Sequence, residues 1–232
     1  MTTALKADHA ANGDSDAWIG ELRDLIAEHQ WTRCEIIRAI AEGRASREAI
    51  KRWAMEYYHY SSIATPNAFV MLANAPDRQT YAAWGHNMAG ELGYLEEPEH
   101  LVLLCELPSE LGADNEQIAS YVPLPATLGA AFTVSYYFRR SFEEGIAAGV
   151  ASENMAVEAM EVIYEGLKRH YAIDSRFFKV HIVAEQEHAQ MGLALLKKHA
   201  GTPALRQRMK HAILNTCLTK RQMWIACEAF LI

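Results

Sequence analysis

The residues best suited to chemistry form a regular pattern at His181, Glu185 and His188. They stand at positions i, i+4 and i+7, so a helix would place all three within roughly 40° of one another on one face. Two imidazoles and a carboxylate are donors that suit iron, manganese or zinc, and Glu-x-x-His is the spacing used in carboxylate-rich metal bundles. The alternative is a solvated helix face, because Glu187 and Gln190 give this segment a polar side.

Further candidate ligands lie in two other segments of the chain. Glu97 and His100 stand three residues apart and would share one helical face, whereas Glu91 and His100 fall on opposite faces of a straight helix. Geometry therefore favours Glu97, and Glu91 could reach His100 only across a broken helix. Glu153 follows a run of small apolar residues and is a third carboxylate candidate. An acidic loop and a charge in the first turn of a helix are the alternatives.

Aromatic and cationic residues could line a substrate pocket near such a centre. We expect Tyr57 and Tyr137 to contact substrate, and Arg139 to hold a substrate carboxylate through paired hydrogen bonds. Core packing for the tyrosines and surface charge for the arginine are the alternative roles.

The elements that must position these residues are predicted to be helices. Apolar residues recur at helical spacing through most of the chain, and no segment alternates with the period of a strand. Residues 1–13 are expected to be a disordered tail and residues 14–232 a single helical domain. Pro108 is expected to stop one helix, while glycines within 145–150 allow either a break or close packing.

Composition narrows the functional classes. The chain has 232 residues, is 50% hydrophobic and 22% charged, and carries a net charge of -7, so it is neither disordered nor suited to nucleic acid or an anionic membrane surface. No apolar run is long enough to span a bilayer and no secretory signal is recognisable, so we expect a cytoplasmic protein. Four scattered cysteines indicate reduced, buried thiols. A small-molecule substrate is the expected partner, and a homodimer remains open.

The sequence resembles the heme-oxygenase-like helical superfamily, which includes thiaminase II proteins, the pyrroloquinoline-quinone synthase and heme-oxygenase-like di-iron oxidases. The likeness covers nearly the whole chain after residue 15. The specific motif is His181-x3-Glu185-x2-His188, which is similar to the signature of the di-iron branch. The weaker motifs are Glu28 to Trp31 with residues 45–58, Asn87 to Tyr94 followed by His100, and Glu144 to Glu153 with Glu165 downstream.

The resemblance implies a single all-α heme-oxygenase-like bundle of about seven helices and a six-ligand metal centre. The implied ligands are Glu91 or Glu97, His100, Glu153, His181, Glu185 and His188. They would hold two Fe(II) ions, with Fe/Mn as a variant and O2 as co-substrate. The implied protein is a non-heme di-iron oxidase or oxygenase acting on an amino acid, amine or fatty acid.

Two other functions are kept beside the di-iron reading. One is a metal-free cofactor-biosynthesis oxidase of the pyrroloquinoline-quinone-synthase type, and the other is a non-catalytic helical binding protein. Thiaminase II chemistry is disfavoured, because it needs a nucleophilic cysteine in the middle helices and none stands between Cys105 and Cys217.

Overall fold

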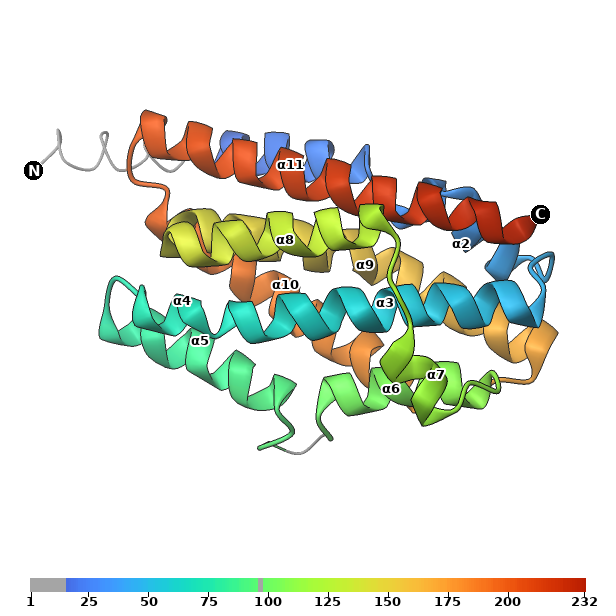
Figure 1. Ribbon diagram of the computed structural model, residues 1–232. Coiled ribbons are helices and arrows are strands. Elements are labelled where there is room, and N and C mark those ends of the chain that lie inside the picture. Colours follow the sequence, from blue (N-terminus) through green and yellow to red (C-terminus); the bar gives the residue numbers. More distant parts are fainter. Residues whose placement is uncertain (1–15, 96–97) are drawn as a thin grey trace, which may run out of the picture.

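The computed structural model describes residues 16–95 and 98–232, without the side chains of residues 184–187. The expected tail over residues 1–13 lies outside these residues. Within them every regular element is helical, which confirms the all-α prediction (Figure 1).

Ten α-helices, α2 to α11, follow a helical stretch at 16–27 in the described part of the chain, against the expected seven or so. In chain order the elements are η1 (Trp31–Arg33), α2 (Glu35–Ala41), α3 (Arg47–Ala68), α4 (Val70–Ala73), α5 (Arg78–Glu91), α6 (His100–Glu110), α7 (Asn115–Ser120), α8 (Pro125–Arg140), α9 (Phe142–Tyr171), α10 (Arg176–His199), α11 (Pro203–Cys227) and η2 (Glu228–Leu231).

Short helices account for the higher number. The four-residue α4 is separated from α3 at Phe69, three residues after Pro66, and the six-residue α7 begins with a capping box at Asp114 and Gln117. Pro108 does not stop α6, which continues to Glu110, so that expectation was wrong. A proline near the end of a helix removes few hydrogen bonds.

The 30-residue helix α9 is the centre of the bundle and packs against α2, α8, α10 and α11. It runs without a break through 145–150, so the glycines there serve close packing. At Gly145 an added Cβ would lie 3.0 Å from Met71 Sδ. At Gly166 it would lie 2.5 Å from the Cα of Ala41, so only glycine lets α9 approach the end of α2 this closely.

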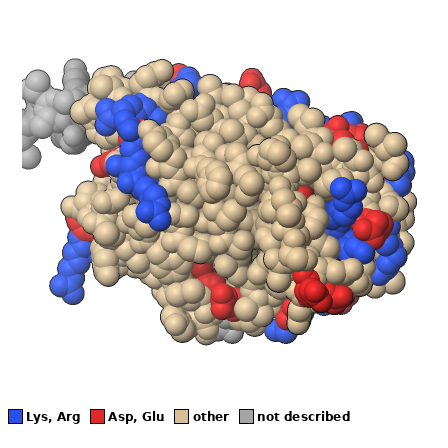
Figure 2. Space-filling view, in the orientation of Figure 1, with Lys and Arg blue, Asp and Glu red and all other residues tan. Residues whose placement is uncertain are grey.

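The surface over α3, α8 and α11 is mostly uncharged in its middle, with charged side chains towards both ends (Figure 2). Its exposed apolar side chains include Phe132, Tyr136 and Leu218. Among the described residues no helix is long and apolar enough to cross a membrane.

Candidate functional site

Three imidazoles and a carboxylate meet between α5, α6 and α10. The ring centroids of His100 and His181 are 4.3 Å apart, and those of His100 and His188 are 6.3 Å apart. Oε1 of Glu91 lies 3.2 Å from Nδ1 of His100 and 3.7 Å from Nδ1 of His188. We call Glu91, His100, His181 and His188 the histidine cluster. Residues far apart in sequence thus lie close together in the bundle.

Helix ends bring Glu91 and His100 together. Glu91 is the last residue of α5 and His100 is the first residue of α6, so the break between the helices removes the opposite-face problem of a straight helix. His181 and His188 lie two turns apart on α10, which places them on one face as expected. The structure therefore brings Glu91 to His100, while Glu97 lies outside the described residues.

His181 is held as a neutral imidazole of defined tautomer. Its Nδ1–H donates to the Phe177 carbonyl at 3.0 Å, which leaves Nε2 as the nitrogen able to accept a proton. Burial, followed by the neighbouring His100, lowers the pKa of His181 to about 3, although Glu91 opposes the shift. This ring is therefore uncharged at neutral pH.

Glu91 is the anionic member of the histidine cluster. Burial raises the pKa of Glu91, but the three nearby histidines, His100 first, together outweigh burial and hold the pKa below its usual value. Nδ1 of His100 is buried and has no aligned hydrogen bond, despite its 3.2 Å distance from the carboxylate. The cluster thus combines a carboxylate with a buried nitrogen that lacks a hydrogen-bond partner.

The histidine cluster forms one wall of a cavity of about 120 Å³. The rest of the lining is largely apolar and aromatic, with Tyr57, Trp84, Phe138 and Phe177 among its residues. Asn87 also lines it, and its buried Oδ1 has no hydrogen-bond partner in the described structure. A small, mostly apolar cavity with a few convergent polar groups is the usual form of a small-molecule site.

Glu153 lines the same cavity from α9, beside α10. A Cβ at Gly192 would lie 3.7 Å from Oε2 of Glu153 and 2.8 Å from a methyl carbon of Val150, so glycine allows the two helices to meet here. The side chain of Glu185 lies outside the described residues. Of the seven metal candidates, the structure therefore brings Glu91, His100, Glu153, His181 and His188 to one cavity.

The substrate-binding candidates separate in space. Tyr57 is buried and lines the cavity. Tyr137 is buried outside the lining and accepts a hydrogen bond from Asn215 Nδ2 at 2.7 Å. Arg139 is exposed, and its Nε donates to Asn67 Oδ1 at 2.6 Å.

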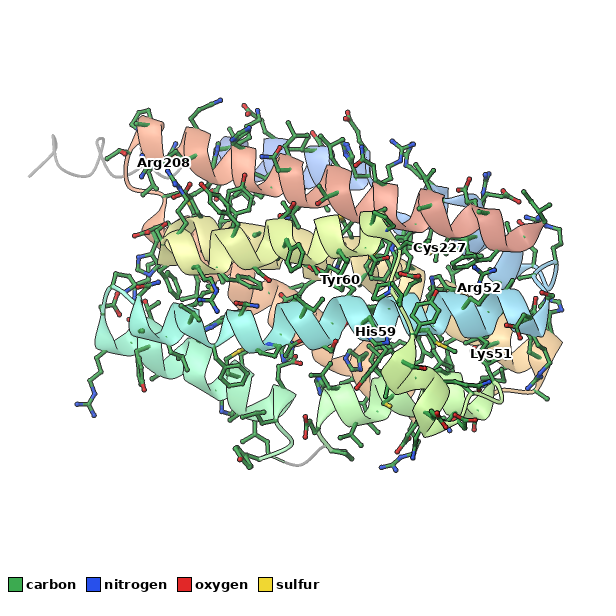
Figure 3. All side chains as sticks on the ribbon, viewed as in Figure 1. Lys51, Arg52, His59, Tyr60, Arg208 and Cys227 are labelled. Atoms are coloured by element: carbon green, nitrogen blue, oxygen red, sulfur yellow. The ribbon has the colours of Figure 1, made fainter. Side chains whose placement is uncertain are left out.

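Sequence reasoning missed a second polar group on the cavity wall. Lys220 from α11, Ser152 from α9 and Tyr60 from α3 line the cavity and contact one another. Tyr60 is labelled on α3 in Figure 3. None belongs to a spaced motif. One sequence pattern could have pointed to Lys220. It shares a helical face with the apolar residues Cys217, Met223 and Trp224, which are buried.

Iron is implied by the resemblance, and the donor types at this site suit it. Glu91, His100 and His188 offer oxygen and nitrogen donors, and Nδ1 of His100 has no other partner among the described residues. However, no group of three or more His, Cys, Asp or Glu that could hold a metal ion is found among the described residues. The donor types therefore suit iron, but the described side chains do not form a coordination site.

A family model described as "Iron-containing redox enzyme" matches residues 51–220. The chain belongs to this family. A curated relative, the pyrroloquinoline-quinone synthase of Rhodopseudomonas palustris, is 26% identical over 219 residues, covering 91% of this chain and 86% of the relative. The family and its relatives are redox enzymes and biosynthetic enzymes, which supports an enzymatic role.

Solved structures confirm the heme-oxygenase-like fold. A CADD-like protein of unknown function from Nostoc punctiforme has a TM-score of 0.75 at 17% identity, covering 93% of this chain and 97% of that one. A domain with a heme oxygenase-like fold from Shewanella denitrificans has a TM-score of 0.73 at 15% identity, covering 99% and 93% of the two chains.

The expected function as an O2-activating di-iron oxidase or oxygenase is contradicted by these comparisons. The curated relatives found are named pyrroloquinoline-quinone synthases, the type that the sequence analysis kept as a metal-free alternative. The error has a physical cause. Histidines and carboxylates at helical spacing converge equally well in a proton-transfer site and in a metal site, and spacing alone does not distinguish them.

Proposed function

We propose that this protein is a small-molecule oxidase of cofactor biosynthesis, of the pyrroloquinoline-quinone-synthase type, which oxidises its substrate without a metal ion. The observation that carries the proposal is the convergence of Glu91, His100, His181 and His188 on one largely apolar cavity. The relatives named for this activity align over most of the chain, which supports the same reaction class.

The histidine cluster would serve as the acceptor of substrate protons. Oxidation by two electrons removes two hydrogens from the substrate, and O2 taking up both electrons and both protons becomes H2O2. Nε2 of His181 can accept a proton, because Nδ1 already donates to Phe177. The Glu91 carboxylate lies where it would stabilise a proton on His100 or His188.

The chemistry also requires a cavity that excludes water and holds the substrate in one orientation. Phe138, Phe177 and Trp84 are buried and form apolar walls. Such walls exclude water and strengthen the electrostatic effect of Glu91 on the imidazoles.

The test uses protein from which metal ions have been removed with a chelator. Reduced, electron-rich heterocyclic acids are offered as substrates, and O2 consumption and H2O2 formation are measured together. We expect His181→Ala to lower the rate by roughly 10²- to 10⁴-fold, the usual contribution of a positioned acid or base. His86→Ala is the matched control, because His86 is exposed on α5, the helix that carries Glu91. Equal rates in H181A and wild-type protein, or no oxidation of any compound, would contradict the proposal.

Iron is a separate proposal that concerns binding alone. We propose that Glu91, His100 and His188 can take up one Fe(II) ion, which the metal-free oxidation proposed above does not require. The expected second ion would depend on side chains at 97 and 185, outside those described. Anaerobic calorimetry with Fe(II) should show uptake by wild-type protein and by H86A, and at least a tenfold loss in His100→Ala. Unchanged uptake in H100A would exclude these ligands.

A further inference from the structure

A buried lysine without a carboxylate partner faces the same cavity from the last long helix. Lys220 is only 3% exposed, and none of the ion pairs among the described residues includes it. Burial of a cation without a counter-charge is costly, so such residues are rare unless they serve a ligand. The lysine therefore lacks a structural partner of opposite charge.

Its contacts are neutral groups. Nζ of Lys220 donates to Ser152 Oγ at 2.5 Å, and it lies 4.8 Å from the ring centroid of Trp31 and 4.5 Å from that of Tyr60. The Tyr60 hydroxyl is 3.3 Å from the same Ser152 oxygen. The neighbouring Cys217 offers no counter-charge, because burial raises the pKa of its thiol to about 12. Aromatic faces and a hydroxyl compensate an ammonium only in part.

We propose that Lys220, with the hydroxyls of Ser152 and Tyr60, binds a carboxylate of the substrate. All three residues line the cavity that contains the histidine cluster. One cation and two hydroxyls match a single negative charge, and most of the other residues that line the cavity are apolar. The substrate class is therefore a small carboxylic acid with an apolar body, whose oxidisable part meets the histidines.

This inference rests on the proposed function only in using the same cavity, and its test requires no turnover. Calorimetry would compare straight-chain carboxylates from butanoate to octanoate with their primary amides, which have nearly the same shape but no charge. We expect wild-type protein to prefer the carboxylate by roughly tenfold or more, as for a hydrogen bond to a charged group. Lys220→Met should abolish this preference and Ser152→Ala should weaken it.

Three further variants separate this site from other sources of binding. Lys220→Arg keeps the charge and should retain a preference for carboxylates. Lys210→Met removes a half-buried lysine of the same helix, which pairs with Glu21, and should bind as wild type. His181→Ala should lose turnover but keep carboxylate binding, so failure of the oxidase proposal and failure of this one give different results.

The stability of K220M provides a second readout. Removal of a buried cation that lacks a counter-charge should leave the melting temperature unchanged or raise it. A carboxylate preference that persists in K220M, or one that disappears in H181A instead, would overturn the proposal. So would a K220M variant that melts at a lower temperature while K220R also fails to bind carboxylates, because Lys220 would then be structural.

Discussion

At the residue scale, the polar side chains of the site differ in the groups that surround each of them. Nδ1–H of His181 donates a hydrogen bond to a backbone carbonyl, Glu91 is held ionised among imidazoles, and Lys220 contacts a hydroxyl and aromatic rings. These environments differ although the three residues line one cavity. Under the two proposals, the lysine would bind the carboxylate of a substrate and the histidine cluster would accept its protons.

Asp77 provides a prediction on pH dependence away from the site. Its side chain accepts from the backbone N–H of Thr80 at the start of α5, and Lys198 adds an ion pair at 3.0 Å. The Thr80 hydrogen bond first, and Lys198 next, lower the pKa of Asp77 from 3.8 to about 2. A carboxylate with a lowered pKa contributes its stability above the unfolded value and loses it as the pH falls through the folded value.

We therefore expect Asp77→Asn to be less stable than wild type at neutral pH, with a difference that declines from about pH 4 to pH 2. Urea midpoints of both proteins across this range measure it. Asp114→Asn serves as the comparison variant, because Asp114 also accepts a backbone hydrogen bond at the start of a helix, the short α7. A difference between D77N and wild type that stays constant down to pH 2 would contradict the assignment.

At the element scale, the sequence predicted the long helices well and the breaks less well. Repeated apolar spacing specifies a helix such as α10 from local information. Pro108 misled, because its local preference to end a helix has little effect so close to the end of α6, whereas the sequence left both a break and close packing open at Gly145. Whether a glycine breaks a helix or admits a neighbour depends on contacts distant in sequence.

The candidate site was predictable to a similar degree. The period of α10 indicated that His181 and His188 share a face, and it was correct. The contact of Glu91 with His100 could not be predicted from spacing, because it depends on where α5 ends and α6 begins. Lys220 belongs to no sequence motif, and its burial away from a carboxylate is visible only in the folded protein.

Gly166 gives a prediction for the packing of α9 on α2. A methyl group there would overlap the backbone of Ala41, including its oxygen at 2.9 Å, and backbone cannot move aside as a side chain can. We expect Gly166→Ala to lower the free energy of unfolding by about 1–3 kcal/mol, despite the better helix propensity of alanine. Chemical denaturation measures the change.

Gly129 is the matched control for that substitution. It lies within α8, and an added Cβ would meet no atom within 4 Å. Gly129→Ala should therefore stabilise the protein by about 0.5–1 kcal/mol. If G166A were as stable as G129A, the close approach of α9 to α2 would be wrong.

At the scale of the whole molecule, the central position of α9 predicts cooperative unfolding. This helix packs against α2, α8, α10 and α11, and one large apolar cluster runs through the bundle. Unfolding of any of these helices would expose the apolar surface of the others. Far-ultraviolet circular dichroism and tryptophan fluorescence should give coincident guanidinium transitions.

Transitions that do not coincide would contradict the prediction of cooperative unfolding. Two separate transitions, or a fluorescence change that precedes the loss of helix, would show that part of the bundle unfolds alone. The variant G166A should move both probes to lower denaturant together. The homodimer stays a prediction, which sedimentation equilibrium of the same samples would check.

The continuity of α9 has a consequence for substrate choice. Adjacent residues of this rod, Ser152 and Glu153, border the lysine and the α10 side of the cavity respectively. Because consecutive side chains on a helix diverge by about 100°, the unbroken α9 holds Ser152 and Glu153 at a fixed angle on the cavity wall. Under the proposed function, this border of the cavity would limit the size of the acid that fits. Engineering the protein for longer acids would therefore have to reshape the walls at Trp84 or Phe138 and leave α9 intact.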